Sequence, residues 1–366
     1  MTTKRKIMFE HHYDEGPASM APDRVPEMEG HCCAPQGRDA FALSVPGEHG
    51  PTTTHSASPE DSRHRVDQAR VPAQTFAMGD AQGDGKWADG ETPVHPVALA
   101  AFEIDATSVT NDDFARFVDA TAHRTESEVF GYSAVFHLAF AGDEADVIGR
   151  PPQTPWWWGV RGADWRHPGG RHSSIEGLGD HPVVQVSWND AVAYCGWAGR
   201  ALPTEAQWEA ASRGGATSVR YPWGEELGAT EGSGDRWPVN IWQGTFPSTN
   251  TTDDGYLTTA PARSYAPNGY GLWQTVGNVW EWCADAFAVD TYARDAAQGT
   301  VRDPSGPSGS RVGAPRVMRG GSFLCHDSYC NRYRNAARSS NTPDSAMSNT
   351  GFRTVGLVAS SEGGAA

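Results

Sequence analysis

Apolar residues recur at helical spacing in the segment Val109–Val118. Phe114, Phe117 and the last residue of the segment fall on one face, at positions i, i+3 and i+4, which is typical of an amphipathic helix. Thr110 or Asn111 can cap this helix, because a side-chain oxygen at that position accepts the first backbone N–H groups. The pattern therefore predicts a first helix here.

Two further helices are predicted from their capping signals. Ser187 is followed three residues later by Asp190, and Thr204 is followed three residues later by Gln207. Both spacings fit a capping box, in which the two side chains satisfy each other's backbone N–H groups. The small and apolar residues predicted on these helices are Ala191, Val192, Cys195, Ala198, Trp208 and Ala211. Cys195 is therefore interpreted as a small buried residue and not as a reactive thiol.

The remaining pattern consists of short strands and turns. Strands are predicted at Phe76–Gly79 and Val94–Leu99, around a Gly- and Asp-rich turn over Asp80–Gly90. From Tyr221 to about Pro315, short strand patterns alternate with turn signals. Residues 71–358 are therefore predicted to form one α+β domain with little regular secondary structure.

The two ends of the chain show no sustained periodicity. Residues 1–70 are rich in Pro, Gly, Ser, His and charge, so we expect a disordered N-terminal arm. This arm contains Cys32 and Cys33, which are interpreted as an incidental exposed pair because adjacent thiols are poorly placed for a metal. Residues 359–366 are expected to be a flexible tail.

Charge and composition narrow the possible partners and the compartment. The 366 residues include 45 acidic and 29 basic ones, a net charge of −16, without a basic cluster, which argues against nucleic acid or an anionic membrane. A basic peptide suits this surface better. The basic first residues are followed by Phe9–Asp14 instead of an apolar signal core, so we expect no secretion. Six cysteines are too few for a disulfide scaffold in a chain of this length, and a cytoplasmic location is expected. The 14 tryptophans predict an irregular backbone held by buried indoles.

The stretch from Arg319 to Arg334 is the strongest chemical candidate. It contains Cys325 and Cys330, flanked by Gly-Gly, a serine, a histidine and several arginines. Two thiols at this spacing could form a disulfide, carry out redox chemistry, remain inert, or bind Cu(I), a soft ion that accepts two or three sulfur ligands. Spacing alone places copper behind a disulfide or an inert pair.

Other chemistries have weaker support. The sequence has no Gly-x-Ser-x-Gly elbow for a hydrolase, and no His-Glu-x-x-His or paired Cys-x-x-Cys zinc motif. Asn250–Tyr256 and Gln274–Glu281 offer carboxylate, amide and carbonyl oxygens of the kind that suits Ca²⁺. Their spacing is not that of an EF-hand, and Asx-turns with solvated carboxylates are the simpler interpretation.

Taken together, the ordered motifs resemble the sulfatase-modifying factor family over residues 71–358. Within that family, residues 325–334 and Asn341–Ser345 are similar to formylglycine-generating enzymes. Non-catalytic paralogues lack the cysteine pair, and related ergothioneine-pathway oxygenases use a histidine iron site. The landmarks that carry the resemblance are Phe102–Asp105, Val109–Asn111, Asp180–Val183, Ser187–Ala191, Leu202–Glu209, Gly277–Trp282, Arg319–Ser322 and Gly351–Arg353.

The resemblance implies a fold and a reaction. The fold is a single domain distantly similar to C-type lectins. The reaction is an O₂-using oxidation that converts the cysteine in a Cys-x-Pro-x-Arg segment of an unfolded sulfatase to Cα-formylglycine, catalysed by an oxidoreductase that acts on a sulfur group. Cys325 and Cys330 correspond to a Cu(I)-binding pair, with the substrate thiolate as third ligand. Loss of a Cβ hydrogen and hydrolysis of the resulting thioaldehyde complete the implied mechanism.

The resemblance also implies further site residues. Ser322, Tyr329 and Trp280 match residues that line the oxygen and substrate-thiol pocket, and His326 and Arg338 are weaker candidates. One structural calcium ion is implied at Asn240, the Ile241 carbonyl, Asp254 and the Tyr256 carbonyl. A second is implied at Gln274, the Gly277 carbonyl, the Val279 carbonyl and Glu281, although Gln274 stands where asparagine is common.

The departures from the family pattern are informative. Homologues of the secretory pathway have cysteines where this chain has Asn335 and Thr354, so the disulfides of those homologues cannot form here. Cys33, Pro35 and Arg38 nearly match the substrate motif, but the arginine is one residue late, so self-modification is not expected. A monomer is expected. The alternatives are a lectin-like binding module without catalysis and an iron oxygenase that forms a C–S bond.

Overall fold

The computed structural model describes residues 35, 37–41, 63–229, 234, 236–308, 311 and 313–357. All of them fall within one unit of the chain, which begins at His31. No helix in this part of the chain is both long and apolar enough to cross a membrane. The helices are α1 (Asn111–Thr121), α2 (Glu126–Phe130), α3 (Trp188–Ala198), α4 (Glu205–Ser212) and α5 (Thr291–Ala297). Short 3-10 helices span Arg38–Phe41, Trp87–Asp89, His137–Ala139 and Glu144–Asp146.

The strands are short, as predicted, and form several small sheets. They are β1 (Gln68–Val71), β2 (Gln74–Met78), β3 (His95–Leu99), β4 (Phe102–Asp105), β5 (Tyr132–Phe136), β6 (Val147–Gly149), β7 (Trp157–Arg161), β8 (Arg200–Ala201), β9 (Gly244–Thr245), β10 (Thr249–Asn250), β11 (Trp280–Ala286), β12 (Val301–Arg302), β13 (Arg316–Arg319), β14 (Arg338–Asn341), β15 (Thr350–Gly351) and β16 (Val355–Gly356). The strand orders are β1-β4-β16-β8, β14-β13-β11-β15, β12-β3-β2, β5-β7-β6 and β10-β9. The α+β prediction is confirmed.

The three predicted helices form where their capping signals lie. Thr110, Ser187 and Thr204 are the N-caps of α1, α3 and α4, and each completes a capping box with the residue three positions later. Cys195 is buried on α3, as predicted, and burial raises the pKa of its thiol. The helices α2 and α5 were not predicted, although α2 also begins with a capping box, between Thr125 and Glu128.

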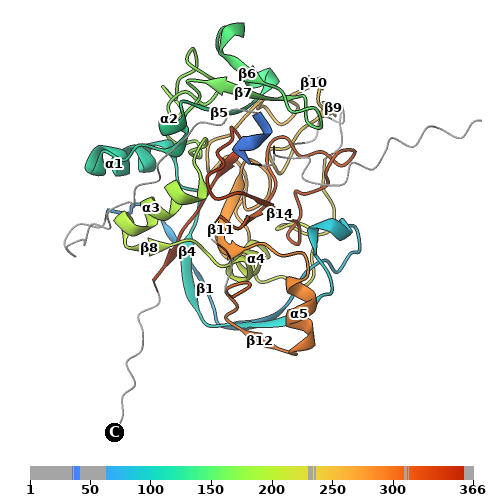
Figure 1. The fold of residues 1–366 in the computed structure, drawn as a ribbon. Helices are drawn as coiled ribbons and strands as arrows, with labels where there is room; N and C mark the ends of the chain where they lie inside the picture. The colour runs from blue at the N-terminus through green and yellow to red at the C-terminus, as the bar shows by residue number, and fades with distance from the viewer. Residues whose placement is uncertain are drawn as a thin grey trace, which may run out of the picture. The chain divides into compact units, whose positions relative to one another are not determined.

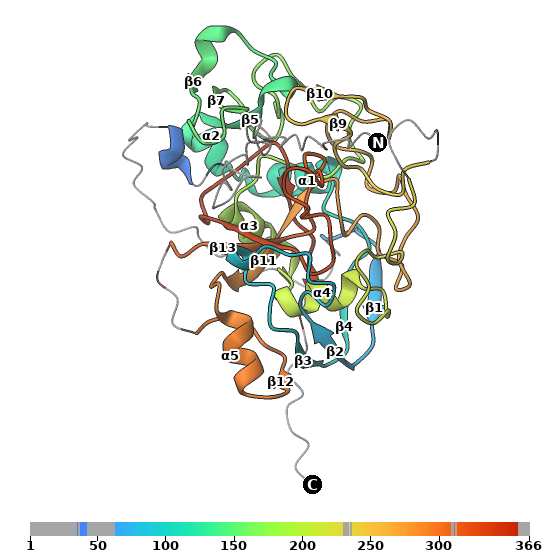
Figure 2. The same ribbon diagram turned by 90° about the vertical axis from the view of Figure 1, so that its right-hand side faces the viewer.

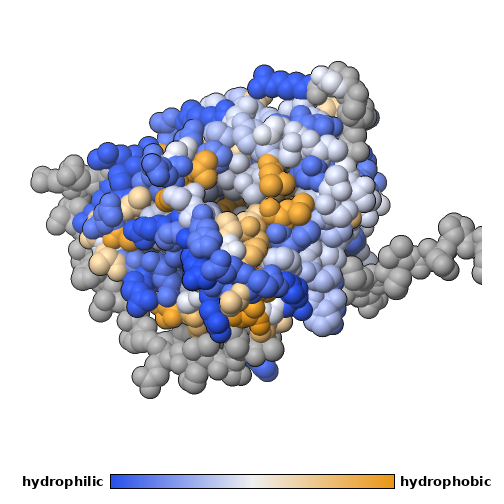
Figure 3. Space-filling model, turned by 90° about the horizontal axis from the view of Figure 1, so that it is seen from above, coloured by the Kyte–Doolittle hydropathy of each residue, from blue (hydrophilic) through white to orange (hydrophobic). Residues whose placement is uncertain are grey.

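The sheets occupy distinct places along the unit. Figures 1 and 2 show β5, β6, β7, β9 and β10 at one end, and α5 with β12 at the opposite end. The sheet that contains β11, β13 and β14 lies between these ends. Seen from the β5–β10 end, apolar side chains gather around a hollow in a mostly hydrophilic face (Figure 3).

Buried indoles hold the irregular backbone together, as predicted. The tryptophans with almost no exposed surface are Trp157, Trp165, Trp208, Trp242, Trp280 and Trp282. The large core cluster that contains them also includes Cys325 and Cys330. The cysteines of the candidate site therefore lie inside the main core.

Parts of the predicted N-terminal arm have a defined structure. β1 begins at Gln68, so the predicted boundary at residue 70 falls inside a strand. Residues 38–41 form a 3-10 helix, and Phe41 is buried in the main core cluster. The rest of the arm up to residue 62, including Cys32 and Cys33, and the predicted tail at 359–366 lie outside the described residues.

Candidate active site

The two candidate cysteines lie on the connection between β13 and β14. These strands pair antiparallel, with Arg319 opposite Arg338. The connection begins with two glycines in the left-handed region, and Gly321 has φ +73°. A Cβ atom on Gly321 would lie 2.7 Å from the backbone oxygen of Arg332 and 3.1 Å from Sγ of Cys325. Only glycine therefore fits at position 321, where the beginning and the end of this connection lie close together.

Hydrogen bonds within the connection fix the positions of both sulfur atoms. The backbone N–H of Cys325 donates to the Ser322 carbonyl at 2.9 Å, and the Ser322 N–H points to Sγ of Cys325 at 3.4 Å. The His326 carbonyl accepts the N–H of Cys330 at 2.9 Å and that of Asn331 at 3.1 Å. Both cysteines are buried and are not joined in a disulfide. The local fold thus encloses a dithiol on one short loop.

A polar group of the predicted pocket lies beside this dithiol. Ser322 is fully buried, and its Oγ accepts a hydrogen bond from Nδ2 of Asn349 at 2.9 Å. The backbone N–H of Trp280 donates to the Asn349 carbonyl at 2.9 Å, so β11 and the segment before β15 meet at Ser322. Within the described residues, the buried Trp280 Nε1 has no hydrogen-bond acceptor. Asn349 was not among the predicted site residues.

Aromatic side chains form one wall of the site. The Tyr329 ring stacks on Phe246, with ring centres 4.0 Å apart, and meets Trp156 edge-on at 5.4 Å. Trp242 contacts Phe246 edge-on, and its backbone N–H donates to the Cys325 carbonyl at 3.1 Å. Phe246, Tyr329 and Trp156 are only partly buried, so this wall reaches the surface.

The arginines that follow the cysteines serve as internal anchors. Arg332 forms two bonds to the Asp89 carboxylate, at 2.6 and 2.7 Å. Arg338 pairs in the same way with Glu205 of α4 and is fully buried, although it was a weaker candidate for the pocket. Such bidentate pairs fix geometry as well as charge. They hold the β13–β14 connection, which carries both cysteines, against the rest of the core.

The other weaker candidate, His326, lies nearer the surface. Its Nδ1 is 2.7 Å from Oγ of Ser328 and 3.2 Å from the Asp327 carboxylate. Its main contribution to the site geometry is the backbone carbonyl that holds the turn to Cys330.

The first predicted calcium set is gathered in one place. Oδ2 of Asp254 accepts the Ile241 N–H at 3.0 Å, and Oδ1 accepts the Tyr256 N–H at 3.0 Å. Burial raises the pKa of Asp254, since its neighbours are N–H donors and not cations. The buried Oδ1 of Asn240 has no hydrogen-bond donor among the described residues. A half-buried carboxylate and an unsatisfied oxygen fit a hard cation such as Ca²⁺.

The second predicted calcium set fits less well. Gln274 has a buried Oε1 with no donor within the described part of the chain. The Glu281 carboxylate, however, already accepts bonds from Ser108, Trp208 and Arg353. These four bonds occupy the acceptor capacity of a carboxylate, and the Arg353 guanidinium neutralises its charge. In this conformation Glu281 is an internal ion-pair partner.

No group of three or more His, Cys, Asp or Glu side chains in the described ranges could hold a metal ion. The cysteine pair offers only two ligands of these residue types. The predicted calcium sets depend mainly on amide and backbone oxygens. Their chemistry therefore depends on the donors described above and not on a side-chain triad.

Comparison with known proteins identifies the relatives of this arrangement. The family model described as "Sulfatase-modifying factor enzyme 1-like domain" matches residues 54–357. The chain is 59% identical over 298 residues to a formylglycine-generating enzyme of Streptomyces coelicolor, covering 81% of this chain and 90% of that protein. It is 52% identical over 283 residues to one of Thermomonospora curvata, covering 77% of this chain and 91% of that protein. Among solved structures, PvdO from Pseudomonas aeruginosa has a TM-score of 0.57 at 20% identity, covering 79% of this chain and 93% of that one, which indicates a shared fold.

Proposed function

The chain belongs to the sulfatase-modifying factor family, and we propose on this premise that it is an enzyme that oxidises a cysteine of a sulfatase polypeptide to Cα-formylglycine. We further propose that the target cysteine lies in a Cys-x-Pro-x-Arg segment of the unfolded polypeptide, that O₂ is the oxidant, and that the chain works as a monomer in the cytoplasm. The names of the relatives support the activity. The site geometry supports its chemistry.

The observation that carries the proposal is the buried dithiol of Cys325 and Cys330. Two thiolates held on one short connection form a donor set that suits Cu(I). Bound Cu(I) would supply one-electron chemistry with O₂ that side chains cannot provide. Burial of both sulfur atoms keeps bulk water away from the reacting cysteine.

The surrounding residues position the substrate. The partly exposed rings of Tyr329, Phe246 and Trp156 offer apolar area against which a peptide can pack beside the dithiol. Ser322 is held by Asn349, so its hydroxyl can donate toward oxygen as negative charge develops there. The unsatisfied Trp280 N–H is a second candidate donor for this task.

We propose a structural calcium ion at Asn240, Ile241, Asp254 and Tyr256. The raised pKa of Asp254 and the unsatisfied Asn240 oxygen support this site. An ion there would stabilise the loop that precedes the second set. The second set remains a prediction, because Glu281 would have to exchange one of its present partners for the ion.

The test is conversion of a synthetic Cys-x-Pro-x-Arg peptide by the full chain with one equivalent of Cu(I), followed by mass spectrometry. The expected result is the mass loss of CH₂–SH becoming CHO. Turnover should disappear in Cys325→Ala and in Cys330→Ala, and should persist in Cys195→Ala, which removes a buried thiol from α3. A peptide that binds but keeps its mass would instead indicate a binding module.

A further inference from the structure

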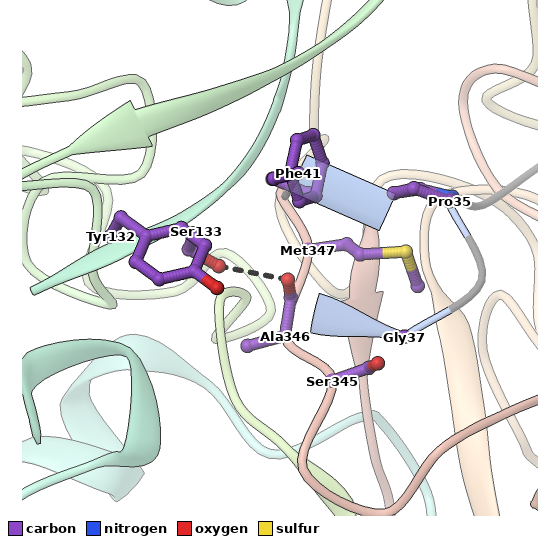
Figure 4. Close-up of a pocket in the computed structure, with 9 residues that line it drawn as sticks. Pro35, Gly37, Phe41, Tyr132, Ser133, Ser345, Ala346 and Met347 are labelled. Atoms are coloured by element: carbon purple, nitrogen blue, oxygen red, sulfur yellow. Dashed lines mark hydrogen bonds between the residues drawn. The ribbon is translucent and has the colours of Figure 1, made fainter. Parts of the chain in front are cut away.

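A segment from the N-terminal part of the chain occupies a hollow near the candidate site. Figure 4 shows Pro35, Gly37 and Phe41 against Tyr132, Ser133 and Ser345–Met347. Phe41 is 5% exposed, and its ring meets that of Tyr132 edge-on at 6.4 Å. The cavity left around the segment is about 10 Å³, space for about one water molecule. The segment therefore fills the hollow almost completely.

The hollow binds this segment through its main chain. Nδ2 of the buried Asn341 donates to the Pro35 carbonyl at 3.1 Å, and Oδ1 accepts the Gly37 N–H at 3.0 Å. Bonds to a carbonyl and to the N–H two residues later do not depend on side chains, and the same kind of main-chain pairing lets binding domains accept peptides of different sequence. Asn341 could therefore hold another extended peptide in the same way.

The Phe41 ring has a place of its own. A Cβ atom on Gly159 of β7 would lie 2.7 Å from Cδ1 of Phe41, and one on Gly149 would lie 3.2 Å from the Phe41 carbonyl oxygen. The absence of side chains at these two glycines makes room for the segment. An aromatic anchor in such a pocket is the usual source of binding energy in a short peptide contact.

Two routes connect the hollow to the candidate active site. Strand β5 begins at Tyr132 in the hollow and ends at Phe136, whose ring stacks on Phe246 at 6.0 Å. Four residues of strand span about 13 Å at ~3.3 Å per residue. On the other side, Met347 of the hollow is close in sequence to Asn349, which holds Ser322. An extended peptide needs about four residues to follow β5 from the aromatic wall to the hollow, at ~3.3 Å per residue.

We propose that this hollow is a peptide-binding extension of the active site and that Pro35 and residues 37–41 occupy it in cis, in competition with the substrate polypeptide. The inference rests on the proposed function, since it assigns the competitor of that substrate. In the sequence, Cys33, which lies outside the described residues, and Pro35 stand at the cysteine–proline spacing of the proposed substrate. The chain thus carries its own weak competitor, and a substrate must displace it.

The test compares two variants of the full chain that release the segment by different means. Phe41→Ala removes the anchor, and Gly37→Ala strains the backbone of the segment itself, because Gly37 has φ +66°. Both changes lie in the segment, so the surface that receives it is left intact. Phe102→Ala is the matched control, because Phe102 is equally buried, at 6% exposed, but lies in a different core cluster. The Kd of a fluorescent Cys-x-Pro-x-Arg peptide with about six flanking residues on each side is measured by anisotropy under argon. KM and kcat are then measured in air.

A segment that is bound in most molecules leaves the hollow open in fewer than half of them. Its release should therefore lower Kd and KM at least about twofold without changing kcat. Phe102→Ala should lower only the midpoint of thermal unfolding. Unchanged Kd in both folded variants would overturn the competition. Tighter binding in the variants without turnover in any protein, the unsubstituted chain included, would support the competition and contradict the proposed oxidation.

Discussion

Gly321→Ala is the substitution for which the structure gives the sharpest expectation. Gly321 has φ +73°, and an alanine there would place its Cβ 2.7 Å from the Arg332 carbonyl oxygen and 3.1 Å from Sγ of Cys325. The left-handed conformation alone costs an alanine about 1–2 kcal/mol. The overlap with a fixed backbone atom adds about 1–3 kcal/mol, the usual cost of overpacking. Arg332 cannot retreat freely, because Asp89 holds its side chain.

Gly299→Ala separates these two costs. Gly299 has φ +80°, but a Cβ there would meet no atom within 4 Å. Urea unfolding should therefore show a loss of about 1–2 kcal/mol for Gly299→Ala and a clearly larger loss for Gly321→Ala. Displacement of Cys325 should also weaken Cu(I) binding at least about tenfold, or ~1.4 kcal/mol, in Gly321→Ala only.

The assay for copper affinity is competition with a chromophoric Cu(I) chelator. The Cu(I) affinity is measured at urea concentrations at which both variants remain folded. Equal Cu(I) affinity of folded Gly321→Ala and the unsubstituted chain would refute the idea that the glycine sets the position of the sulfur. Equal unfolding free energies of the two glycine variants would refute the predicted overlap with Arg332.

Three further substitutions test the calcium set, a buried carboxyl and the aromatic wall. If calcium binds this set, it should raise the Tm of the unsubstituted chain, and Asp254→Asn should abolish that rise. Without calcium the variant should not lower Tm, since burial already raises the pKa of Asp254. A calcium effect that persists in the variant would exclude this ligand. Burial and the nearby Glu205 charge raise the pKa of Asp285 to about 7. The favourable contribution of Asp285 to the free energy of unfolding is therefore fully present below its unfolded pKa near 4 and is lost as pH rises through 7. Between pH 5 and 8 the unfolding free energy of the unsubstituted chain should fall by about 2–3 kcal/mol relative to Asp285→Asn, and parallel pH profiles would contradict this. Phe246→Ala should raise KM for the peptide more than it lowers kcat, because its ring supports Tyr329 and not the sulfur atoms; a loss confined to kcat would count against the aromatic wall.

The helices that were predicted depend on residues only a few positions apart, and such spacings can be recognised in the sequence. Thr110, Ser187 and Thr204 cap their helices because a capping box needs only residues three positions apart. Helix α2 carries the same signal at Thr125, but its five residues are too few to show an apolar period. The capping signal alone would have been enough to find it.

The residues of the candidate site also fall into two groups, those that are close in sequence and those that only the tertiary fold brings together. Ser322, Cys325 and Cys330 lie on one connection, so their proximity is a local property. Phe246 and Asn349 come from distant segments, and only the tertiary fold brings them to this connection. No spacing in the sequence encodes such contacts, and buried aromatic residues far from the cysteines could equally have been ordinary core.

For the few described residues before β1, composition alone is a poor guide to local structure. A segment rich in Pro, Gly and charge resembles a linker when it stands alone. Phe41 nevertheless finds a pocket that two distant glycines create, and Asn341 supplies main-chain bonds to the residues before it. Whether such a segment is ordered depends on its receiving surface, which its own composition does not describe.

Cys325 and Cys330 are proposed to form a copper site that oxidises a substrate cysteine. The most direct test of this claim is the initial rate of peptide conversion by the metal-free chain as Cu(I) is added stepwise. The rate should rise from zero and level off at one equivalent of Cu(I), and it should stay at zero in Cys325→Ala at every step. Conversion that proceeds equally well before copper is added, or in Cys325→Ala, would contradict the claim.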